Sequence, residues 1–264
     1  MEKIKILREK TGVGIVDCKL ALEEADGNME KAIEILRKKG IAKAAKRSDR
    51  DAQEGVIKLA VIDDKKGLMV EINAETDFVV RNEKFQQFTN KLINLIKEKQ
   101  PKDLEELMIL DLENASVKET LDNLSGVIGE KLDIKRYDML VSNGTVESYL
   151  HTGGKVGVLV SLDKTGKNEL AHEIAMQIAA ANPKYITPEQ VPAEEVTKEK
   201  EIYREQLKKE GKPENIIEKI INGKINKYYE EVCLVKQEFI KDETKRVSDI
   251  LGEVKVESFI RYSL

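Results

Sequence analysis

The sequence predicts an α+β fold, and three changes in its residue pattern support this prediction. The first 40 residues carry apolar side chains at helical spacing in three short segments. From Gly55 onward, a strand hairpin followed by a helix occurs twice, about 90 residues apart, which indicates an internal duplication. After Pro192 a charged helical stretch is interrupted by Gly211-Lys212-Pro213, which is typical of an antiparallel helical hairpin, here expected at about residues 197–231.

Residues 1–40 are expected to form a small three-helix module. The turn Thr11-Gly12-Val13-Gly14 ends the first helix, Asn28 is placed to cap the third, and Gly40 is placed to end it. The apolar positions of the three helices are, in order, Ile4 and Leu7, then Cys18, Ala21, Leu22 and Ala25, and finally Met29, Ala32, Ile33 and Leu36. Because a module of about 40 residues buries little apolar surface, a role in protein binding is favoured.

A basic segment follows this module, and residues 41–54 are assigned as a linker. Two interpretations of its charge are open: a phosphate-binding patch, or a solvated linker helix between domains. The linker is favoured because no aromatic or glycine-rich sequence accompanies the charge. The cations of this region, against the single acid Asp49, are Arg37, Lys38, Lys39, Lys43, Lys46, Arg47 and Arg50.

The remaining chain is divided into two α+β units, residues 55–140 and 141–264, the second containing the helical hairpin. Alternating and β-branched runs predict the strands, and helical spacing predicts the helices between them. The first unit is expected to contain strands at 56–62, 69–72 and 134–140, a helix through Phe85, Phe88, Leu92 and Leu95, and a helix at 118–132. The second is expected to contain strands at 146–150, 156–160 and 254–262, a helix through Leu170, Ile174 and Ile178, and a helix at 247–251.

Composition argues against several classes of function. The formal net charge is −4, which does not fit a general nucleic-acid binder. The two cysteines, Cys18 and Cys233, have no spacing typical of a disulfide framework or a zinc site, and no phosphate-binding glycine motif is present. Neither histidine, His151 nor His172, has a neighbour that would activate a nucleophile. We therefore expect a protein that is not an enzyme and uses no cofactor or metal.

The same reasoning gives an expected location. No apolar run approaches the ~20 residues that span a bilayer, and the N-terminus lacks the apolar region of a signal peptide. A cytoplasmic protein with no membrane partner is expected.

One segment has an unusual combination of residues. Glu71–Asn82 follows a predicted strand and precedes the helix expected to begin near Glu83. In one interpretation Thr76 and Asp77 cap that helix and Phe78 packs in the core. In the other, Phe78 is an aromatic anchor that projects from a rigid turn into a pocket of a partner.

Glu71–Asn82, with its Thr-Asp-Phe-Val sequence, closely resembles the hallmark segment of the translation elongation factor Ts family. Leu7–Leu22, followed by an Asp-Gly-Asn turn and a segment ending at Gly40, resembles the N-terminal motif of the same family. Weaker similarities follow in the family's order and extend the resemblance to nearly the whole chain. They are at 129–134, at His151 and 156–159, at 175–180 and at 237–239.

The resemblance implies an architecture and a partner. The fold would be a three-helix domain similar to ubiquitin-associated domains, a core of two related α+β subdomains, and an inserted coiled-coil hairpin. The extra C-terminal module of some members is not expected, because the sequence ends at Leu264. The partner would be elongation factor Tu, both GDP-bound and nucleotide-free, and neither nucleotide nor nucleic acid would bind this chain directly.

The resemblance also implies which residues make the contact. The counterpart of Phe78 acts as a wedge that disturbs the GTPase elements supporting magnesium and phosphate, with the counterpart of Asp77 beside it. Thr76 and Val79 would hold the backbone of this wedge. Arg8, Ile15 and Val16 would dock on the GTPase domain, unless Ile15 or Val16 belongs to the core of the module. His151 and its glycine-rich turn would contact another part of the partner.

Two other functions remain open from the sequence. An RNA- or ribosome-binding protein would use the basic segment, and its binding would weaken when Lys43, Lys46 and Arg47 are neutralised. An adaptor would use the three-helix module to bind a GTPase without changing GDP release.

Overall fold

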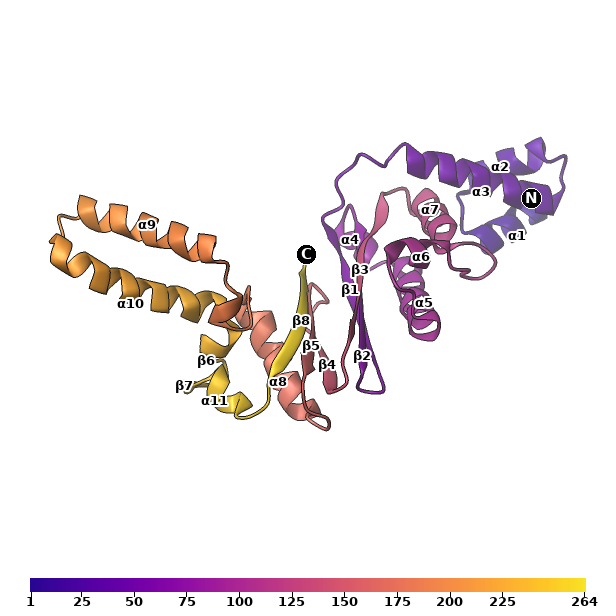
Figure 1. The fold of residues 1–264 in the computed structure, drawn as a ribbon. Coiled ribbons are helices and arrows are strands. Elements are labelled where there is room, and N and C mark those ends of the chain that lie inside the picture. The colour runs from indigo at the N-terminus through magenta and orange to yellow at the C-terminus, as the bar shows by residue number, and fades with distance from the viewer.

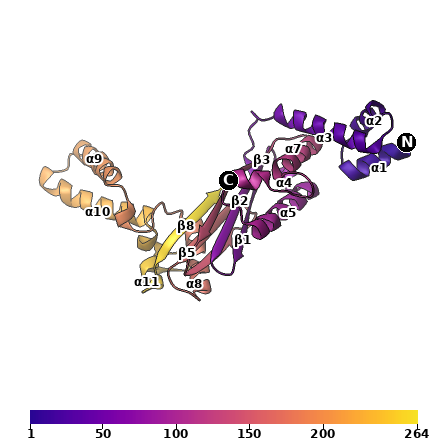
Figure 2. The same cartoon turned by 45° about the vertical axis from the view of Figure 1, so that its right-hand side comes forward.

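A computed structural model describes residues 1–264 and confirms the predicted α+β class. The molecule is elongated, with the N-terminal helices at one end of a central pair of sheets and a helical hairpin at the other (Figures 1 and 2). The helices are α1 (Glu2–Thr11), α2 (Ile15–Glu24), α3 (Met29–Ala45), α4 (Asp77–Val80), α5 (Glu83–Lys99), α6 (Leu104–Ile109), α7 (Val117–Ile128), α8 (Asn168–Ala181), α9 (Ala193–Lys209), α10 (Glu214–Val232) and α11 (Val247–Leu251), with 3-10 turns at Pro188–Gln190 and Leu234–Lys236. The strands are β1 (Glu54–Ile62), β2 (Lys66–Ala74), β3 (Leu132–Val141), β4 (Thr145–Leu150), β5 (Val156–Leu162), β6 (Glu238–Phe239), β7 (Asp242–Arg246) and β8 (Val256–Ser263).

The three N-terminal helices follow from their local sequence. Gly12 ends α1 with a left-handed φ of 69°, a conformation that costs glycine little. Asn28 caps α3, because its side-chain oxygen accepts a hydrogen bond of 3.0 Å from the backbone nitrogen of Lys31. The small core of this module consists of Leu7, Cys18, Ala21, Leu22, Ala25, Ala32 and Leu36.

The prediction that Gly40 ends the third helix is wrong, since α3 continues to Ala45. The glycine serves a helix crossing instead. A Cβ atom placed on Gly126 of α7 would lie 2.7 Å from the Cα atom of Gly40, which is too close for two carbon atoms, so the two backbones leave no room for a side chain at position 126. Gly40 therefore permits α3 to pack on α7, and the residues after it keep good helix propensity.

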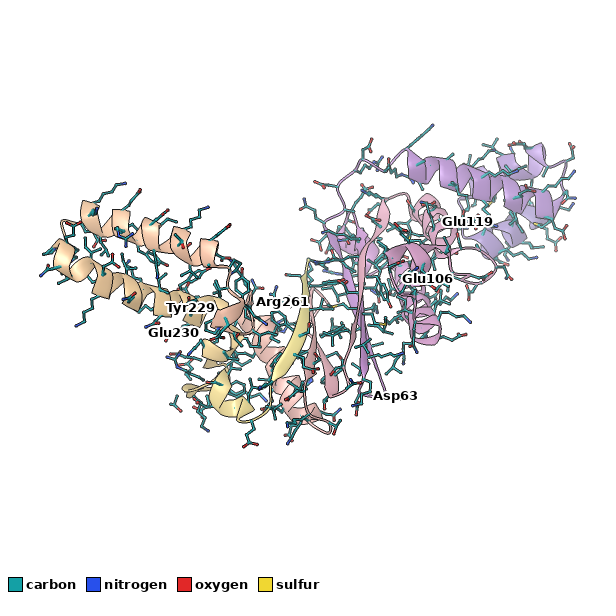
Figure 3. All side chains as sticks on the ribbon, in the orientation of Figure 1. Asp63, Glu106, Glu119, Tyr229, Glu230 and Arg261 are labelled. Carbon is teal, nitrogen blue, oxygen red and sulfur yellow. The ribbon has the colours of Figure 1, made fainter.

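The basic segment is occupied mainly by internal contacts. Arg37 forms an ion pair of 2.5 Å with Glu119, which is labelled on α7 in Figure 3. Of the cations named above, Lys46 alone has no acidic or carbonyl partner. The pairs are Arg37 with Glu119, Lys38 with Glu34, Lys39 with Glu24, Lys43 with Asp17, Arg47 with the carbonyl of Ser125, and Arg50 with Glu75. Since most of these cations are already bonded within the chain, the segment is better described as a structural linker than as a phosphate-binding patch.

Two antiparallel three-stranded sheets form the body. The first has the order β1-β2-β3, and α5, α6 and α7 cover one face of it. The second has the order β4-β5-β8 and is covered by α8. The uncovered faces of the two sheets pack on each other through Ile57, Met69, Leu140, Val146, Leu159 and Tyr262.

Several boundaries differ from the prediction. The helix expected at 118–132 ends at Ile128, because Gly129 adopts a φ of 92° and terminates it. The short elements α4, α6, β6 and β7 were not predicted, since segments of two to six residues carry little periodic signal.

The charged stretch after Pro192 forms the expected hairpin, in which α9 and α10 pack side by side and project from the body (Figure 1). At its base, the Glu195 carboxylate accepts hydrogen bonds from the hydroxyl groups of Tyr185, at 2.6 Å, and Tyr228. No helix in the structure is both long and apolar enough to cross a membrane.

Candidate functional site

Phe78 projects into solvent from the short helix α4, between β2 and α5. Its side chain is 79% exposed, and it is the only aromatic residue among the large apolar side chains on the surface. The interpretation that Phe78 packs in the core is therefore wrong. An exposed phenylalanine on an ordered element leaves a large apolar area available to a partner.

The residues around Phe78 hold its backbone from several sides. Val79 points the opposite way and is 6% exposed, within the core of the first sheet. Asp77 accepts a hydrogen bond of 2.9 Å from Arg81 one turn later. Thr76 precedes the helix, and its hydroxyl group donates to the Glu130 carboxylate at 2.9 Å rather than capping α4.

The interpretation that Thr76 and Asp77 cap the following long helix is also wrong. Asn82 caps α5, since its side-chain oxygen accepts from the backbone nitrogen of Lys84 at 2.9 Å. The single turn of α4 is thus a separate element from α5.

A second apolar surface lies on the N-terminal module. Ile15 is 55% exposed and Val16 is 71% exposed, so neither is a core residue, and Arg8 is exposed as well. Leu20, which is 50% exposed, extends this surface and was not predicted. The exposure of Leu20 could have been predicted from its spacing, because it lies one helical turn after Val16 and outside the stripe of core residues. We call Ile15, Val16 and Leu20 the α2 face.

The turn that leads into the α2 face contacts the first turn of α5. The Lys84 ammonium group donates a hydrogen bond of 3.1 Å to the carbonyl oxygen of Gly12. This contact therefore links the N-terminal module to the helix that follows α4.

A third surface surrounds His151, which is exposed in the turn after β4 as predicted. Its Nδ1 atom lies 3.0 Å from the hydroxyl oxygen of Tyr149, whose ring also packs edge-on against His172 with centroids 5.7 Å apart. Beside them is an apolar cavity of about 450 Å³. Its lining residues are Tyr149, His151, Val156, Met176, Ala179, Ala180 and Ile240. The sequence indicated His151 but not the other residues, which come from distant segments.

Exposed apolar side chains such as those of Phe78 and the α2 face leave area available to a partner. A larger hollow of about 460 Å³ lies between the N-terminal module and α7, and Phe78 does not line it. No group of three or more His, Cys, Asp or Glu side chains is arranged to hold a metal ion. The charged group nearest in sequence to α4 whose pKa is perturbed is Glu75. The backbone N–H of Lys131, and then Arg50, lower its pKa, so it is held as an anion by structural partners.

Comparison with known proteins gives a consistent family. The family model described as "Elongation factor TS" matches residues 75–264. The chain is 46% identical to the elongation factor Ts of Chlorobaculum parvum, over 99% of this chain and 96% of that protein. It is 46% identical to that of Nitratiruptor sp., covering 99% and 92% of the two chains. The corresponding protein of Clostridium botulinum is 44% identical, with 99% and 91% covered.

Proposed function

This chain belongs to the elongation factor Ts family, and on that premise we propose that it is a guanine-nucleotide exchange factor for the translation GTPase elongation factor Tu. It binds the GDP-bound form, promotes release of GDP, and leaves the nucleotide-free GTPase ready to take GTP. It does so in the cytoplasm, without covalent chemistry and without binding nucleotide, cofactor or nucleic acid itself.

Thermodynamic linkage defines what such a factor must do. If the factor binds the nucleotide-free GTPase more tightly than the loaded one, it weakens nucleotide binding by the same ratio. Each tenfold change in that ratio requires about 1.4 kcal/mol of differential contact. The magnesium ion of the GTPase is a sensitive target, because its octahedral shell tolerates little displacement.

The observation that carries the proposal is the exposure of Phe78 on a tightly held turn. We propose that its ring enters the GTPase between side chains that support the magnesium and phosphate site, with Asp77 beside it. Thr76 and Val79 hold the turn from behind. Burying a phenylalanine that is now 79% exposed contributes about 2 kcal/mol, or about 30-fold in rate or affinity.

The other two surfaces are proposed to provide docking. The N-terminal module, which we take to be similar to ubiquitin-associated domains, places the α2 face and Arg8 on the GTPase domain. The cavity beside His151, on the second of two related α+β units, contacts another part of the partner. Because the three surfaces lie on separate elements, loss of one is expected to weaken exchange without abolishing complex formation.

The proposal is tested by measuring release of a fluorescent GDP analogue from purified elongation factor Tu. Substoichiometric native chain should accelerate release, and Phe78→Ala should reduce the maximal rate about 30-fold. Ile109→Ala is the matched control, because Ile109 is 76% exposed and lies on α6, which contributes no residue to the three surfaces. Its rate should equal that of the native chain.

Each alternative gives a different outcome. If the native chain forms a complex with the GTPase and leaves GDP release unchanged, it is an adaptor. Binding to RNA that weakens on neutralisation of Lys43, Lys46 and Arg47, without any effect on the GTPase, would support the nucleic-acid function. Equal acceleration by native chain and Phe78→Ala would retain the exchange function and remove Phe78 from it.

A further inference from the structure

The element that carries Phe78 is too short to hold itself. Helix α4 has four residues, Asp77–Val80. One turn of helix is unfavourable in isolation, because several backbone dihedral angles are fixed for each hydrogen bond formed. Its order must therefore come from contacts with other parts of the chain.

Helix α4 packs on β1, β2 and α5, and the two residues before it, Glu75 and Thr76, are bonded to the turn between α7 and β3. The Glu130 carboxylate accepts hydrogen bonds from both the backbone nitrogen of Thr76, at 3.1 Å, and its hydroxyl group, at 2.9 Å. In return, the Glu75 carboxylate accepts a bond of 2.5 Å from the backbone nitrogen of Lys131. Two neighbouring residues on each segment are thus joined by two carboxylates in opposite directions. We call this arrangement the carboxylate clamp.

Further bonds hold the clamp itself. Ser125, in the last turn of α7, donates a hydrogen bond of 2.6 Å to the carbonyl oxygen of Glu130. Arg50 donates to Glu75 at 3.2 Å, and the Lys131 ammonium group donates to the carbonyl oxygen of Arg50 at 2.9 Å. Hydrogen bonds to ionised groups are stronger than neutral ones, so this arrangement is a stiff support for a short element.

We propose that Glu130 is a positioning residue for nucleotide exchange, which holds the Phe78 turn in its active geometry through Thr76. The proposal rests on the exchange function proposed above. Glu130 fixes Thr76 in the extended conformation, with φ −130° and ψ 155°, from which α4 begins. Val79 then faces the core, at 6% exposed, while Phe78 faces solvent at 79%.

The expected effect is on the maximal rate rather than on docking. Phe78 can displace the partner's side chains only if its own turn is held more rigidly than they are. With a loosened turn, part of the binding energy of Phe78 is spent on ordering α4 at the moment of contact. The α2 face and the His151 surface still dock, so the concentration for half-maximal exchange changes little.

The first experiment compares Glu130→Ala and Glu130→Gln in the GDP-release assay, with Glu98→Ala as a control on the exposed end of α5. Glu130→Ala should lower the maximal rate about tenfold, with a half-saturation concentration within about twofold of native. Glu130→Gln should restore most of the rate, because the amide oxygen still accepts from the Thr76 backbone and its NH₂ group donates to the hydroxyl oxygen. Thr76→Val, which removes only the hydroxyl bond, should give an intermediate rate.

A double-mutant cycle shows whether the effect passes through Phe78. In a Phe78→Ala background, Glu130→Ala should cause no further loss. An equal loss in both backgrounds, or no loss in either, would overturn the proposal.

Hydrogen exchange of the free chain gives a readout that does not depend on the GTPase. The amides that close the α4 turn are those of Val80, Arg81 and Asn82, which donate to Thr76, Asp77 and Val79. In Glu130→Ala these amides should exchange at least tenfold faster, while those in the middle of α5 stay unchanged. Unchanged protection at α4 would refute the positioning role even if Glu130→Ala slows GDP release. If the native chain fails to release GDP, the exchange function fails, and this measurement still decides whether Glu130 orders the turn.

Discussion

The crossing of α3 and α7 offers a sharp test, because the same substitution at its two glycines should have opposite effects. A Cβ atom on Gly126 would lie 2.7 Å from the Cα atom of Gly40 and 3.1 Å from its carbonyl oxygen. A Cβ atom on Gly40 would meet only Asn123, at 3.4 Å from its side-chain oxygen and 3.8 Å from its Cα atom. The first is a clash with backbone, and the second is an ordinary contact.

The magnitudes follow from these distances. Gly126→Ala forces the two helices apart, and overpacking of this kind costs ~1–3 kcal/mol, partly offset by ~1 kcal/mol of helix propensity. The net loss should be about 1 kcal/mol, the middle of the ~0–2 kcal/mol range that these two effects leave. Gly40→Ala keeps the propensity gain without the clash and should stabilise the crossing by ~0.5–1 kcal/mol.

Native-state hydrogen exchange measures both effects locally. Amide protection in the second half of α3 and in α7 should fall in Gly126→Ala and rise in Gly40→Ala, while the amides of α8, on the second sheet, act as an internal reference. Shifts in the same direction for both variants would contradict the close approach of these two backbones. A destabilised crossing should also loosen the α2 face. The concentration of Gly126→Ala needed for half-maximal GDP release from the GTPase should therefore rise.

Two further outcomes follow from buried or tightly bonded groups. Burial raises the pKa of the Cys233 thiol from 9.0 to about 11, so its thiolate fraction near pH 8 is about a hundredfold below that of a free thiol, and alkylation followed by mass spectrometry should label Cys233 only on unfolding. The hydroxyl groups of Tyr185 and then Tyr228 lower the pKa of Glu195 below its usual 4.5. These bonds therefore stabilise the hairpin base above pH 4.5, and this contribution is lost as the pH falls through the lowered pKa. Glu195→Gln should reduce amide protection at the start of α9 near pH 7 and should show a smaller acid-dependent loss than the native chain.

The long elements could be predicted from the sequence because their signals are local. The stripe through Phe85, Phe88, Leu92 and Leu95 fixed α5, and all four side chains are buried. The interruption around Pro213 placed the turn of the helical hairpin. The division into domains at residues 40, 54 and 140 stays a prediction, although α3 runs through the first of these boundaries.

Gly40 shows why the prediction failed where it did. A glycine after a helical stripe usually marks a C-cap, and nothing nearby in the sequence indicated Gly126 as its packing partner. The contact joins segments that are more than 80 residues apart, so only the folded chain reveals that the missing side chain makes room for a second backbone.

In the candidate site, too, residues with a local sequence signal could be predicted, and residues defined by contacts between distant segments could not. Phe78 was recognisable as an anchor because its segment combines an isolated aromatic with a resemblance to a family motif, and its exposure agrees with that prediction. Leu20 was within reach of spacing alone. The surface at His151 was only partly predictable, because its cavity also needs Met176 and Ile240 from distant elements.

Glu130 stood in the sequence as part of a weak similarity with no assigned role. Its carboxylate reaches Thr76 across 54 positions of sequence, and no periodic pattern reports a bond of that kind. The residue that displays an apolar ring could be predicted because an isolated aromatic stands in a segment that resembles a family motif. The residue that keeps the ring in place is an acid among many acids, and it becomes distinguishable only when its hydrogen-bond partners are known. Support residues of binding sites are therefore better sought in the bonds of a fold than in its sequence patterns.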